Sequence, residues 1–445
     1  MEINLKLNKF VVIGAGATGR SIVNYLHYHG AQILHVLDTR LNPPTISGVD
    51  VIGGELEYTN IENADVIVIS PGVSIYEPVL QKAITNGKSV VGDIELFAQA
   101  IQNWSCKVIG ITGSNGKTTV TSLTGFLASK LGIKTLVAGN IGKSVLEAWL
   151  EIEQAKNYPE LIVLELSSFQ LEATSSLRLD SATVLNISED HLDRYRDLLE
   201  YAYVKAHIFN NSLVQVINQD DKLVMSMMRH SQKHVYFAES NSDFSLATHN
   251  GKLWLSINQQ LYLACDALQV VGRHNYHNVL ASLALLSGAG YDVNDFRELV
   301  PQFIGLEHRM QKVVEHNDVL YIEDSKGTNV GAVIAGVGGL DRPVHLILGG
   351  DGKGQDFTPL RQMVLEKCKS VAIIGQDSAL IVQTLVDIPN VNIFSTLPEA
   401  VNACIDVAIA GDAVVLSPAC ASWDMFTDYK HRAQVFIDSI YAYIK

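Results

Sequence analysis

Residues 112–119 read TGSNGKTT, and their types and spacing suit the binding of a chain of phosphates. Gly113 lets backbone N–H groups converge on phosphate oxygens, Lys117 adds positive charge near the β- and γ-phosphates, and Thr118 offers a hydroxyl to Mg²⁺. The stretch lies between a predicted strand and a predicted helix, as a phosphate loop requires. It departs from G-x-x-x-x-G-K-[ST] at Ile111, where that pattern has glycine. We therefore predict a variant phosphate-binding loop.

A second glycine cluster, Gly14, Gly16 and Gly19, also lies between a predicted strand and a predicted helix, and Asp38 closes the next strand. This is the dinucleotide fingerprint, in which a helix N-terminus faces a diphosphate and the acid binds a ribose. Three interpretations are open at this point: an NAD site, a turn where glycine only permits close packing, and a site for a nucleotide-sugar, which also joins a diphosphate to a ribose. Residues 70–72 (SPG) end another strand, where such ligands bind.

Glu165 and His191 are expected at the carboxyl ends of strands beside the phosphate loop, and Lys205 on a helix that follows. A hard cation prefers oxygen ligands, so Glu165 is a candidate Mg²⁺ ligand. His191 is a less usual ligand for such a cation, and its residue type and position by themselves favour the start of a helix beside a solvated acidic turn. Lys205 equally fits a lysine that reaches water from a half-apolar helix.

These side chains belong to a chain of 445 residues, long enough for three domains of roughly 150 residues each. The net charge of -14 argues against nucleic-acid binding. The five cysteines include no C-x-x-C pair, so we expect neither a disulfide framework nor a zinc site. The start, MEINLKLNKFVVIG, runs into a strand rather than a signal peptide, and no apolar run is long enough for a membrane span. We expect a cytoplasmic monomer.

Short β-branched runs alternate with helical patterns along the chain, which predicts an α/β fold with parallel sheets. Alternating apolar and polar residues at 252–264 predict a hairpin and hence a small antiparallel patch. We predict three domains: an N-terminal Rossmann-like domain at 1–103, a central ATPase-type domain at 104–304 and a C-terminal Rossmann-like domain at 305–445. Strands are expected at 9–16, 33–40, 64–70, 89–93, 106–113, 134–140, 160–168, 181–188, 345–354, 370–375, 391–396 and 413–419. Helices are expected at 19–30, 77–87, 94–102, 118–132 and 277–290.

Taken together, the motifs resemble one family, the ADP-forming Mur ligases, which add amino acids to the peptidoglycan precursor. The family's loop is T-G-[ST]-N-G-K-[ST]-[ST], which accounts for the displaced glycine. The resemblance covers essentially the whole chain, in order. It includes GNIG at 139–142, ELSSFQL at 165–171, EDHLDRY at 189–195, HNYHN at 274–278, EHR at 307–309 and LSPACAS at 416–422.

Within the family, DSKGTN at 324–329 and GGDGKGQDF at 349–357 resemble the branch that joins D-glutamate to UDP-N-acetylmuramoyl-L-alanine. This resemblance favours the nucleotide-sugar over NAD, because the N-terminal glycines would then hold a UDP diphosphate. Two residues depart from the pattern: Gly327 stands where alanine is common, and Tyr429 where phenylalanine is usual. The implied UDP-substrate residues are Gly14, Ala17, Thr18, Asp38, Thr39, Arg40, Ser70, Pro71, Gly72, Asn140, Gln170 and His191.

The resemblance implies that ATP phosphorylates a carboxylate and that the amine of D-glutamate attacks the acyl phosphate. It assigns ATP binding to Gly113, Ser114, Asn115, Gly116, Lys117, Thr118, Thr119, Asn275, Asn278, Arg309 and Asp324, and D-glutamate binding to Lys326, Thr328, Lys353, Ser422 and Tyr429. Catalytic roles fall to Lys117, His191, Lys205 and Arg309, and Mg²⁺ to Thr118, Glu165, His191 and Lys205. Y-x-x-x-K at 201–205 resembles the family lysine that CO₂ converts to a carbamate, an anionic oxygen ligand.

Three other functions would leave different signs. An NAD-dependent oxidoreductase leaves the phosphate loop unexplained. A regulatory nucleotide-hydrolysing module predicts ATP hydrolysis that is independent of D-glutamate. A sibling ligase, or one like folylpolyglutamate synthase, predicts a different amino-acid substrate.

Overall fold

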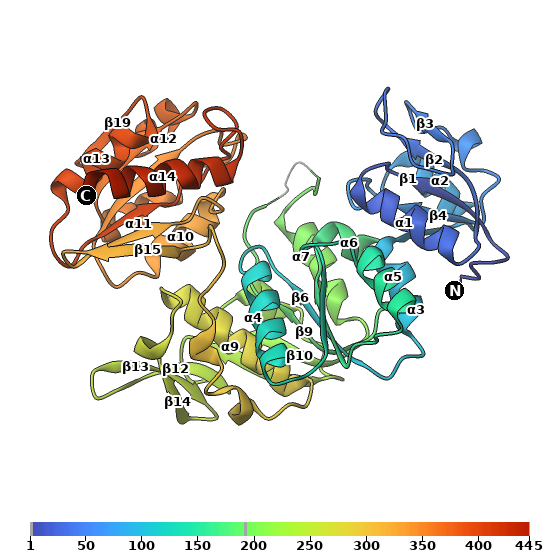
Figure 1. The fold of residues 1–445 in the computed structure, drawn as a ribbon, viewed down its shortest axis with the longest axis horizontal. Helices are drawn as coiled ribbons and strands as arrows, with labels where there is room; N and C mark the ends of the chain where they lie inside the picture. Colours follow the sequence, from blue (N-terminus) through green and yellow to red (C-terminus); the bar gives the residue numbers. More distant parts are fainter. Residues whose placement is uncertain (1–2, 191–193, 445) are drawn as a thin grey trace. The chain divides into compact units, whose positions relative to one another are not determined.

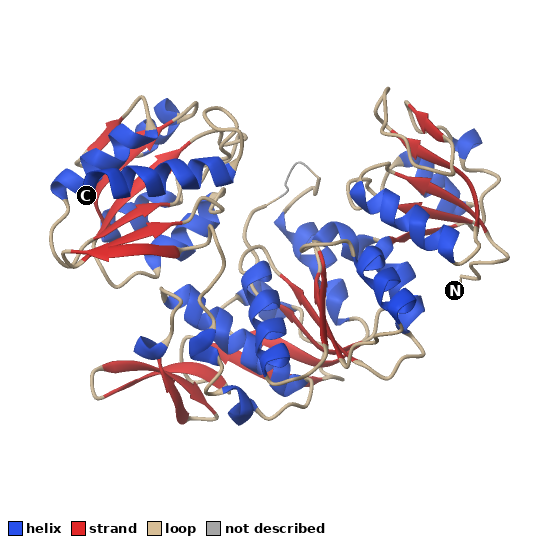
Figure 2. Cartoon of the chain, in the orientation of Figure 1, coloured by secondary structure: helices blue, strands red, loops and turns tan. Residues whose placement is uncertain are grey.

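The computed structural model describes residues 3–190 and 194–444 and contains three α/β domains, each built on its own mostly parallel sheet (Figures 1 and 2). The chain forms two compact units. The first combines Met1–Phe244 with Ala281–Phe296, and the second combines Ser245–Leu280 with Arg297–Lys445. The domain limits at 103/104 and 304/305 stay predictions.

The first sheet has five parallel strands in the order β3-β2-β1-β4-β5. Its strands are β1 (Lys9–Ile13), β2 (Gln32–Asp38), β3 (Val51–Gly53), β4 (Val66–Ile69) and β5 (Ser89–Gly92). Apolar residues of α1 (Ala17–Tyr28) and α3 (Asp93–Ile101) pack with one face and those of α2 (Pro78–Thr85) with the other. The strand order reverses between β1 and β4, where a crevice for a ligand is expected.

The second sheet contributes six parallel strands to the first unit, in the order β11-β10-β9-β6-β8-β7. They are β6 (Lys107–Thr112), β7 (Thr135–Gly139), β8 (Leu161–Glu165), β9 (Leu179–Val184), β10 (Ser212–Asn218) and β11 (Lys233–Ala238). The helices between them are α4 (Lys117–Lys130), α5 (Val145–Ala155), α6 (Ser168–Glu172), α7 (Leu198–Ala206) and α8 (Lys222–Ser226). The central position of β6 places the end of that strand between the ends of β8 and β9.

The predicted antiparallel patch is present in the second unit. It contains β13 (Lys252–Ile257), which pairs with β14 (Gln260–Ala264) in antiparallel register, after β12 (Phe244–His249). Asn258 and Gln259 occupy the turn with φ of +49° and +64°, the left-handed region that a two-residue hairpin turn uses. The helix α9 (Arg273–Gly288) follows.

The third sheet has the order β15-β16-β20-β17-β18-β19, and its pairs are parallel except for the β15–β16 hairpin. Its strands are β15 (Gln311–His316), β16 (Val319–Glu323), β17 (Val344–Gly349), β18 (Cys368–Ile374), β19 (Val391–Ile393) and β20 (Ala413–Leu416). One face packs against α10 (Val330–Gly338), α11 (Leu360–Lys367) and α12 (Ser378–Thr384). The other packs against α13 (Leu397–Val407) and α14 (Tyr429–Ile444).

The expected strands and helices are present, with shifted ends. The strand expected at 181–188 ends at Val184, because residues 186–188 turn away to bond the phosphate loop. The helix expected at 277–290 begins earlier, at Arg273. Several strands were not singled out from the sequence: β3, β10, β11, β12, β15 and β16. In β10, for example, fully buried Gln215 interrupts the apolar pattern. Within residues 3–190 and 194–444, no helix combines the length and apolar character needed to cross a bilayer.

Candidate active site

A cavity of about 630 Å³ lies at the carboxyl ends of β1 and β4, in the first unit. Its lining residues come from six segments of the chain, at 13–18, 38–40, 70–73, 93, 139–144 and 170. The predicted UDP-substrate residues that line it are Gly14, Ala17, Thr18, Asp38, Thr39, Arg40, Ser70, Pro71, Gly72, Asn140 and Gln170. His191 lies outside the described residues. The structure thus brings Asn140 and Gln170, which only the resemblance to a family associated with this site, beside the glycine turn, Asp38 and residues 70–72.

The glycine turn of this cavity serves both packing and access. Gly14 has a φ of +100°, and a Cβ on Gly19 would lie 1.7 Å from the Gly14 carbonyl oxygen, so these two glycines are required by close packing. A Cβ on Gly16 would meet nothing within 4 Å. Gly16 therefore borders open space at the cavity, where the backbone of α1 begins.

Asp38 is held by hydrogen bonds from the glycine turn and from Arg40. Its Oδ2 accepts hydrogen bonds from the Ala15 amide at 2.7 Å and from Nη2 of Arg40 at 2.7 Å, and Oδ1 accepts from Nε of Arg40 at 2.7 Å. The hydrogen bonds from Arg40 are the main reason that the pKa of Asp38 lies well below its usual range. Asp38 therefore stays ionised and ties β2 to the glycine turn, while Arg40, which is 55% exposed, can reach the cavity.

Sequence reasoning missed some residues of this cavity, among them Val73, Ser144 and Asp93. Asp93 is the first residue of α3, its side chain is buried, and its Oδ1 has no hydrogen-bond partner among the described residues. Burial raises the pKa of Asp93 to about 6. A carboxyl residue directly after strand β5 was the available signal, because ligands in parallel sheets gather at strand ends.

The phosphate loop connects β6 to α4. Gly113 and Gly116 have φ of +151° and +85°, and Gly116 is the residue before the first turn of α4. Lys117 donates from Nζ to the carbonyl oxygens of Gly113 and Ser114, both at 2.8 Å. The ammonium is therefore held at the loop and at the N-terminus of α4, where the peptide dipoles also favour an anion. This geometry suits a phosphate chain.

The segment after β9 fixes the rest of the loop. The Asn115 amide donates to Oδ1 of Asn186 at 2.8 Å, and the Ser114 hydroxyl donates to the carbonyl of Ser188 at 3.0 Å. Tyr201 of α7 lies 3.4 Å from the same hydroxyl. These bonds set the loop's shape in place of the glycine missing at Ile111.

Glu165 ends β8 directly beside the loop strand, paired with Ile111 of β6, and is 2% exposed. Its Oε1 accepts a hydrogen bond from Nδ2 of Asn140 at 2.9 Å. Its Oε2 is buried and has no hydrogen-bond partner among the described residues. A buried carboxylate oxygen is costly when unpaired, so a cation or a donor at this position would stabilise it.

Lys205 is 1% exposed on α7, which rules out the exposed side chain considered from its sequence. Its Nζ donates to the carbonyl of Gly113 at 3.0 Å and to the hydroxyl of Thr112 at 3.3 Å. Burial, and then the positive charge of Lys117, lower the pKa of Lys205 well below its ordinary value. The amine is therefore stabilised in its neutral, nucleophilic form beside the phosphate loop.

These residues could bind Mg²⁺ through single oxygen donors near the phosphate loop rather than through a group of three or more ligating side chains. Among residues 3–190 and 194–444, no three His, Cys, Asp or Glu side chains are grouped to hold a metal. The unpartnered Oε2 of Glu165 does match a hard cation. Thr118, at the start of α4, could add a hydroxyl, and Lys205 could add oxygen only after modification.

The remaining predicted ATP residues lie in the second unit. Asn275 on α9 donates from Nδ2 to the carbonyl of Val271 at 2.8 Å, and Asn278 donates to Oδ1 of Asn275 at 3.2 Å. Asp324 follows β16 and uses both oxygens within the chain: Oδ1 accepts from the Met310 amide at 3.1 Å and Oδ2 from the Ser417 hydroxyl at 2.6 Å. Burial raises the pKa of Asp324 to about 7. Arg309 precedes Met310 and is partly buried.

The predicted D-glutamate residues also belong to the second unit. Nζ of Lys326 lies 3.9 Å from the ring centre of Tyr429, a cation–π contact, and Nζ of Lys353 lies 5.2 Å from that of Trp423. Lys326, Thr328 and Lys353 are exposed, whereas Ser422 is buried. The departure at Gly327 has a local reason. A Cβ there would lie 2.4 Å from Oδ2 of Asp324, so alanine would require this carboxylate to move.

Comparison with known proteins decides the family. The chain matches the Mur ligase MurD-like N-terminal domain at residues 8–92, the Mur ligase middle domain at 111–286 and the Mur ligase glutamate ligase domain at 308–420. It is 46% identical over 440 residues to the UDP-N-acetylmuramoylalanine--D-glutamate ligase of Chromobacterium violaceum, with 97% of each chain covered. The enzyme of the same name from Nitrosomonas europaea is 44% identical over 458 residues, covering 98% of this chain and 97% of the relative.

This chain is a Mur ligase. Solved structures of other Mur ligases show the same fold at low identity. MurF of Thermotoga maritima in complex with ADP has a TM-score of 0.62 at 15% identity, covering 99% of both chains. MurF of Acinetobacter baumannii has a TM-score of 0.63 at 16% identity, covering 97% of this chain and 90% of the neighbour. Mur ligases are ATP-dependent enzymes, so membership of this family accounts for the phosphate loop. An NAD-dependent oxidoreductase is therefore no longer needed to explain the N-terminal glycines.

Proposed function

We propose that this Mur ligase joins D-glutamate to UDP-N-acetylmuramoyl-L-alanine, at the expense of ATP and through an acyl phosphate. The curated relatives that carry this activity in their name share 40–46% identity with nearly the whole chain. The structural observation that supports it best is the contact between Asn140 and Glu165. Through it a residue of the cavity that would hold the UDP-substrate contacts a buried carboxylate beside β6, the strand that leads into the phosphate loop.

In this proposal the cavity of the first unit holds the UDP-substrate. Gly14, Ala17, Thr18 and Arg40 are assigned to the diphosphate and uridine. Asn140, Gln170 and His191 are assigned to the muramoyl-alanine end. The carboxylate would reach the γ-phosphate over Glu165 and Lys117. Holding both reactants in this orientation replaces a collision in solution with an intramolecular step.

Phosphate charge is the main obstacle, because the attacking carboxylate is itself an anion. We assign its neutralisation to Lys117, the loop amides of Gly113 to Thr119, and Arg309. Mg²⁺, when bound, would polarise the phosphoryl oxygens. Thr118, Glu165, His191 and carbamylated Lys205 are its proposed ligands. The buried Lys205 amine suits carbamate formation, since only a neutral amine adds to CO₂ and the added group is an anionic oxygen ligand.

In the second unit, Asn275, Asn278 and Asp324 are proposed to hold the nucleoside of ATP. D-Glutamate would bind among Lys326, Thr328, Lys353, Ser422 and Tyr429, where two lysines match its two carboxylates. Its amine would attack the acyl phosphate, and the tetrahedral intermediate would expel phosphate. We propose that the enzyme acts as a monomer, in the cytoplasm.

One assay tests this function. Phosphate release is measured with ATP, Mg²⁺ and UDP-N-acetylmuramoyl-L-alanine in the presence of D-glutamate, L-glutamate, L-alanine or L-lysine. We expect release with D-glutamate only. Phosphate release that does not depend on D-glutamate would indicate a nucleotide hydrolase. Release that requires another amino acid would indicate a sibling ligase.

A further inference from the structure

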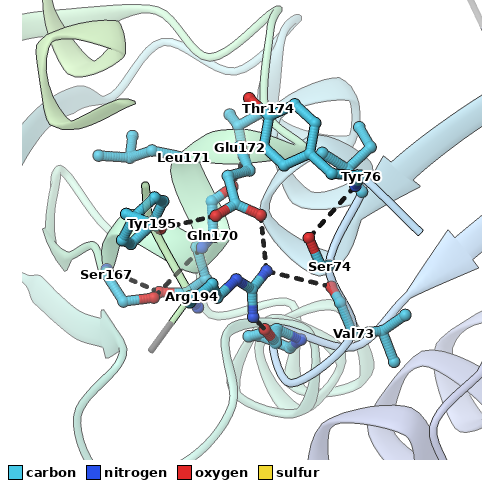
Figure 3. A network of polar contacts seen from close by, with 12 residues as sticks. Val73, Ser74, Tyr76, Ser167, Gln170, Leu171, Glu172, Thr174, Arg194 and Tyr195 are labelled. Carbon is cyan, nitrogen blue, oxygen red and sulfur yellow. Dashed lines mark hydrogen bonds and ion pairs between the residues drawn. The ribbon is translucent and has the colours of Figure 1, made fainter. Parts of the chain in front are cut away.

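Arg194 belongs to the EDHLDRY motif, yet the proposed reaction gives it no role. Its guanidinium donates from Nη1 to the carbonyl oxygen of Pro71 at 2.8 Å and from Nη2 to that of Val73 at 3.2 Å. Pro71, Gly72 and Val73 line the substrate cavity. One side chain therefore holds two carbonyl groups of a single cavity loop, 121 and 123 residues earlier in the sequence (Figure 3).

The guanidinium is itself held in place. Its Nη2 also donates to Oε2 of Glu172 at 2.6 Å, and the Tyr195 hydroxyl donates to Oε1 of the same carboxylate at 2.6 Å (Figure 3). The Glu172 side chain is fully buried and that of Arg194 is 12% exposed. The Phe169 ring lies beneath the guanidinium, 4.0 Å from its central carbon. A buried, stacked and multiply bonded guanidinium has a fixed geometry, unlike an ion pair on the surface.

Glu172 lies on α6, the short helix that also carries the cavity residue Gln170. Gln170 closes the capping box of this helix with Ser167, since the Ser167 amide donates to its Oε1 and the Gln170 amide donates to the Ser167 hydroxyl. Arg194 therefore joins two walls of the cavity, the loop at 71–73 and helix α6.

The hydrogen bond to Pro71 also sets the direction of the next amide. In a trans peptide the C=O and N–H point in opposite directions, and the described residues include no cis peptide. Because the Pro71 carbonyl faces Arg194, the Gly72 N–H faces away from it. A Cβ on Gly72 would meet nothing within 4 Å, so this part of the loop borders open space.

We propose that Arg194 is a positioning residue of the substrate cavity, which holds residues 71–73 so that the Gly72 N–H can donate to an anionic or carbonyl oxygen of the UDP-substrate. The assignment of that ligand rests on the proposed function. Arginine suits the task because its planar fork serves both carbonyls and Glu172 at once, whereas a lysine ammonium is a single point of charge.

The test needs a variant that folds. Arg194→Met alone would leave the Glu172 carboxylate buried without its cation, which is strongly destabilising. The double variant Arg194→Met, Glu172→Gln removes both charges and keeps the volume. Its matched control is Arg196→Met, Glu200→Gln, which removes an Arg–Glu pair two residues further along in which Arg196 is 85% exposed.

Two measurements are compared between these variants and the wild type: hydrogen–deuterium exchange of residues 70–77 without ligand, and the Kd for UDP-N-acetylmuramoyl-L-alanine by calorimetry. We expect faster exchange at 70–77 and a Kd raised about tenfold or more in the Arg194 variant, with the Kd for ATP within about twofold. Arg194→Lys should recover only part of the affinity. The control should match the wild type in both measurements.

Wild-type exchange and affinity in a folded Arg194 variant would overturn this inference while the ligase function stands. Equal losses for the UDP-substrate and for ATP would also overturn it, since they indicate general destabilisation. A wild-type protein that does not bind the UDP-substrate would instead overturn the proposed function and, with it, the ligand assigned to Gly72.

Discussion

Asn140 donates a hydrogen bond from Nδ2 to Oε1 of Glu165 over 2.9 Å, so that a residue of the substrate cavity orients a buried carboxylate beside the phosphate loop. The second oxygen of Glu165 has no partner among the described residues. The Asn140 amide also donates to the Glu165 carbonyl at 2.8 Å, so both the backbone and the side chain of this cavity residue hold Glu165 within one unit of the chain.

Replacing Asn140 with aspartate should disable this contact. A second carboxylate would then face Glu165 at hydrogen-bond distance, and two like charges so close cannot both stay ionised. We expect phosphate release to fall about 100-fold or more. Asn157→Asp adds the same charge at an exposed position and serves as the control. Full activity of Asn140→Asp would show that Glu165 needs no such orientation.

Lys117→Ala should impair the use of ATP while leaving the binding of the UDP-substrate largely intact. Loss of the ammonium at the loop should lower ATP-dependent phosphate release about 100-fold or more. Binding of the UDP-substrate, measured by calorimetry, should stay within about threefold, because its cavity is lined by other residues. Lys130→Ala, at the exposed end of the same helix, should be active. Lost UDP-substrate binding in folded Lys117→Ala protein would contradict this prediction.

Lys205→Arg should keep a positive charge and abolish turnover, since a guanidinium does not form the carbamate. We expect activity to fall about 100-fold or more, through loss of a metal ligand. The wild type incubated with ¹³C-bicarbonate should give a carbamate signal by NMR, and the Arg variant should not. Lys222→Arg, on the exposed start of α8, controls for the exchange of residue types. An active Lys205→Arg enzyme would remove the carbamate from the mechanism.

Asp93 should make the free energy of unfolding depend on pH. Burial raises its pKa from 3.8 to about 6, so between these values the folded chain keeps a proton that the unfolded chain releases. Stability therefore falls as pH rises from about 4 to about 6, by about 3 kcal/mol for this group. Asp93→Asn should remove that loss. The free energy of unfolding is measured with urea at pH 5 and pH 8. The value for the variant minus the value for the wild type should be larger at pH 8.

The control for this measurement is Asp50→Asn, which exchanges the same groups at an exposed position. We expect it to shift stability equally at both pH values. A gain by Asp93→Asn that is independent of pH would mean that the carboxyl does not titrate in this range.

The ring of Tyr429, rather than its hydroxyl, should matter for D-glutamate. Nζ of Lys326 lies over the face of this ring, and phenylalanine offers a similar face. Tyr429→Phe should therefore keep the KM for D-glutamate within about twofold, whereas Tyr429→Ala should raise it about tenfold. Tyr441→Ala, on the same helix α14, is the control. A large effect of Tyr429→Phe would assign the hydroxyl a direct role.

The sequence alone determined those features that depend on interactions between residues close together in the chain. The phosphate loop is one contiguous segment, and the N-terminal glycines fall within six residues, so spacing was sufficient to predict a turn before a helix. Runs of β-branched residues likewise predicted most strands of the three sheets. Strand β10, interrupted by buried Gln215, shows where such a local pattern fails.

Tertiary structure decided what each of these side chains meets. Lys205 could have been an exposed lysine, and only the packing of α7 against the loop buries its amine. Arg194 and the Pro71 carbonyl are 123 residues apart and meet only in the folded chain. Asp93 gives no sign in the sequence of its unpartnered oxygen. Burial, desolvation and hydrogen-bond partners depend on distances between remote segments, so residue types and their spacing cannot contain them.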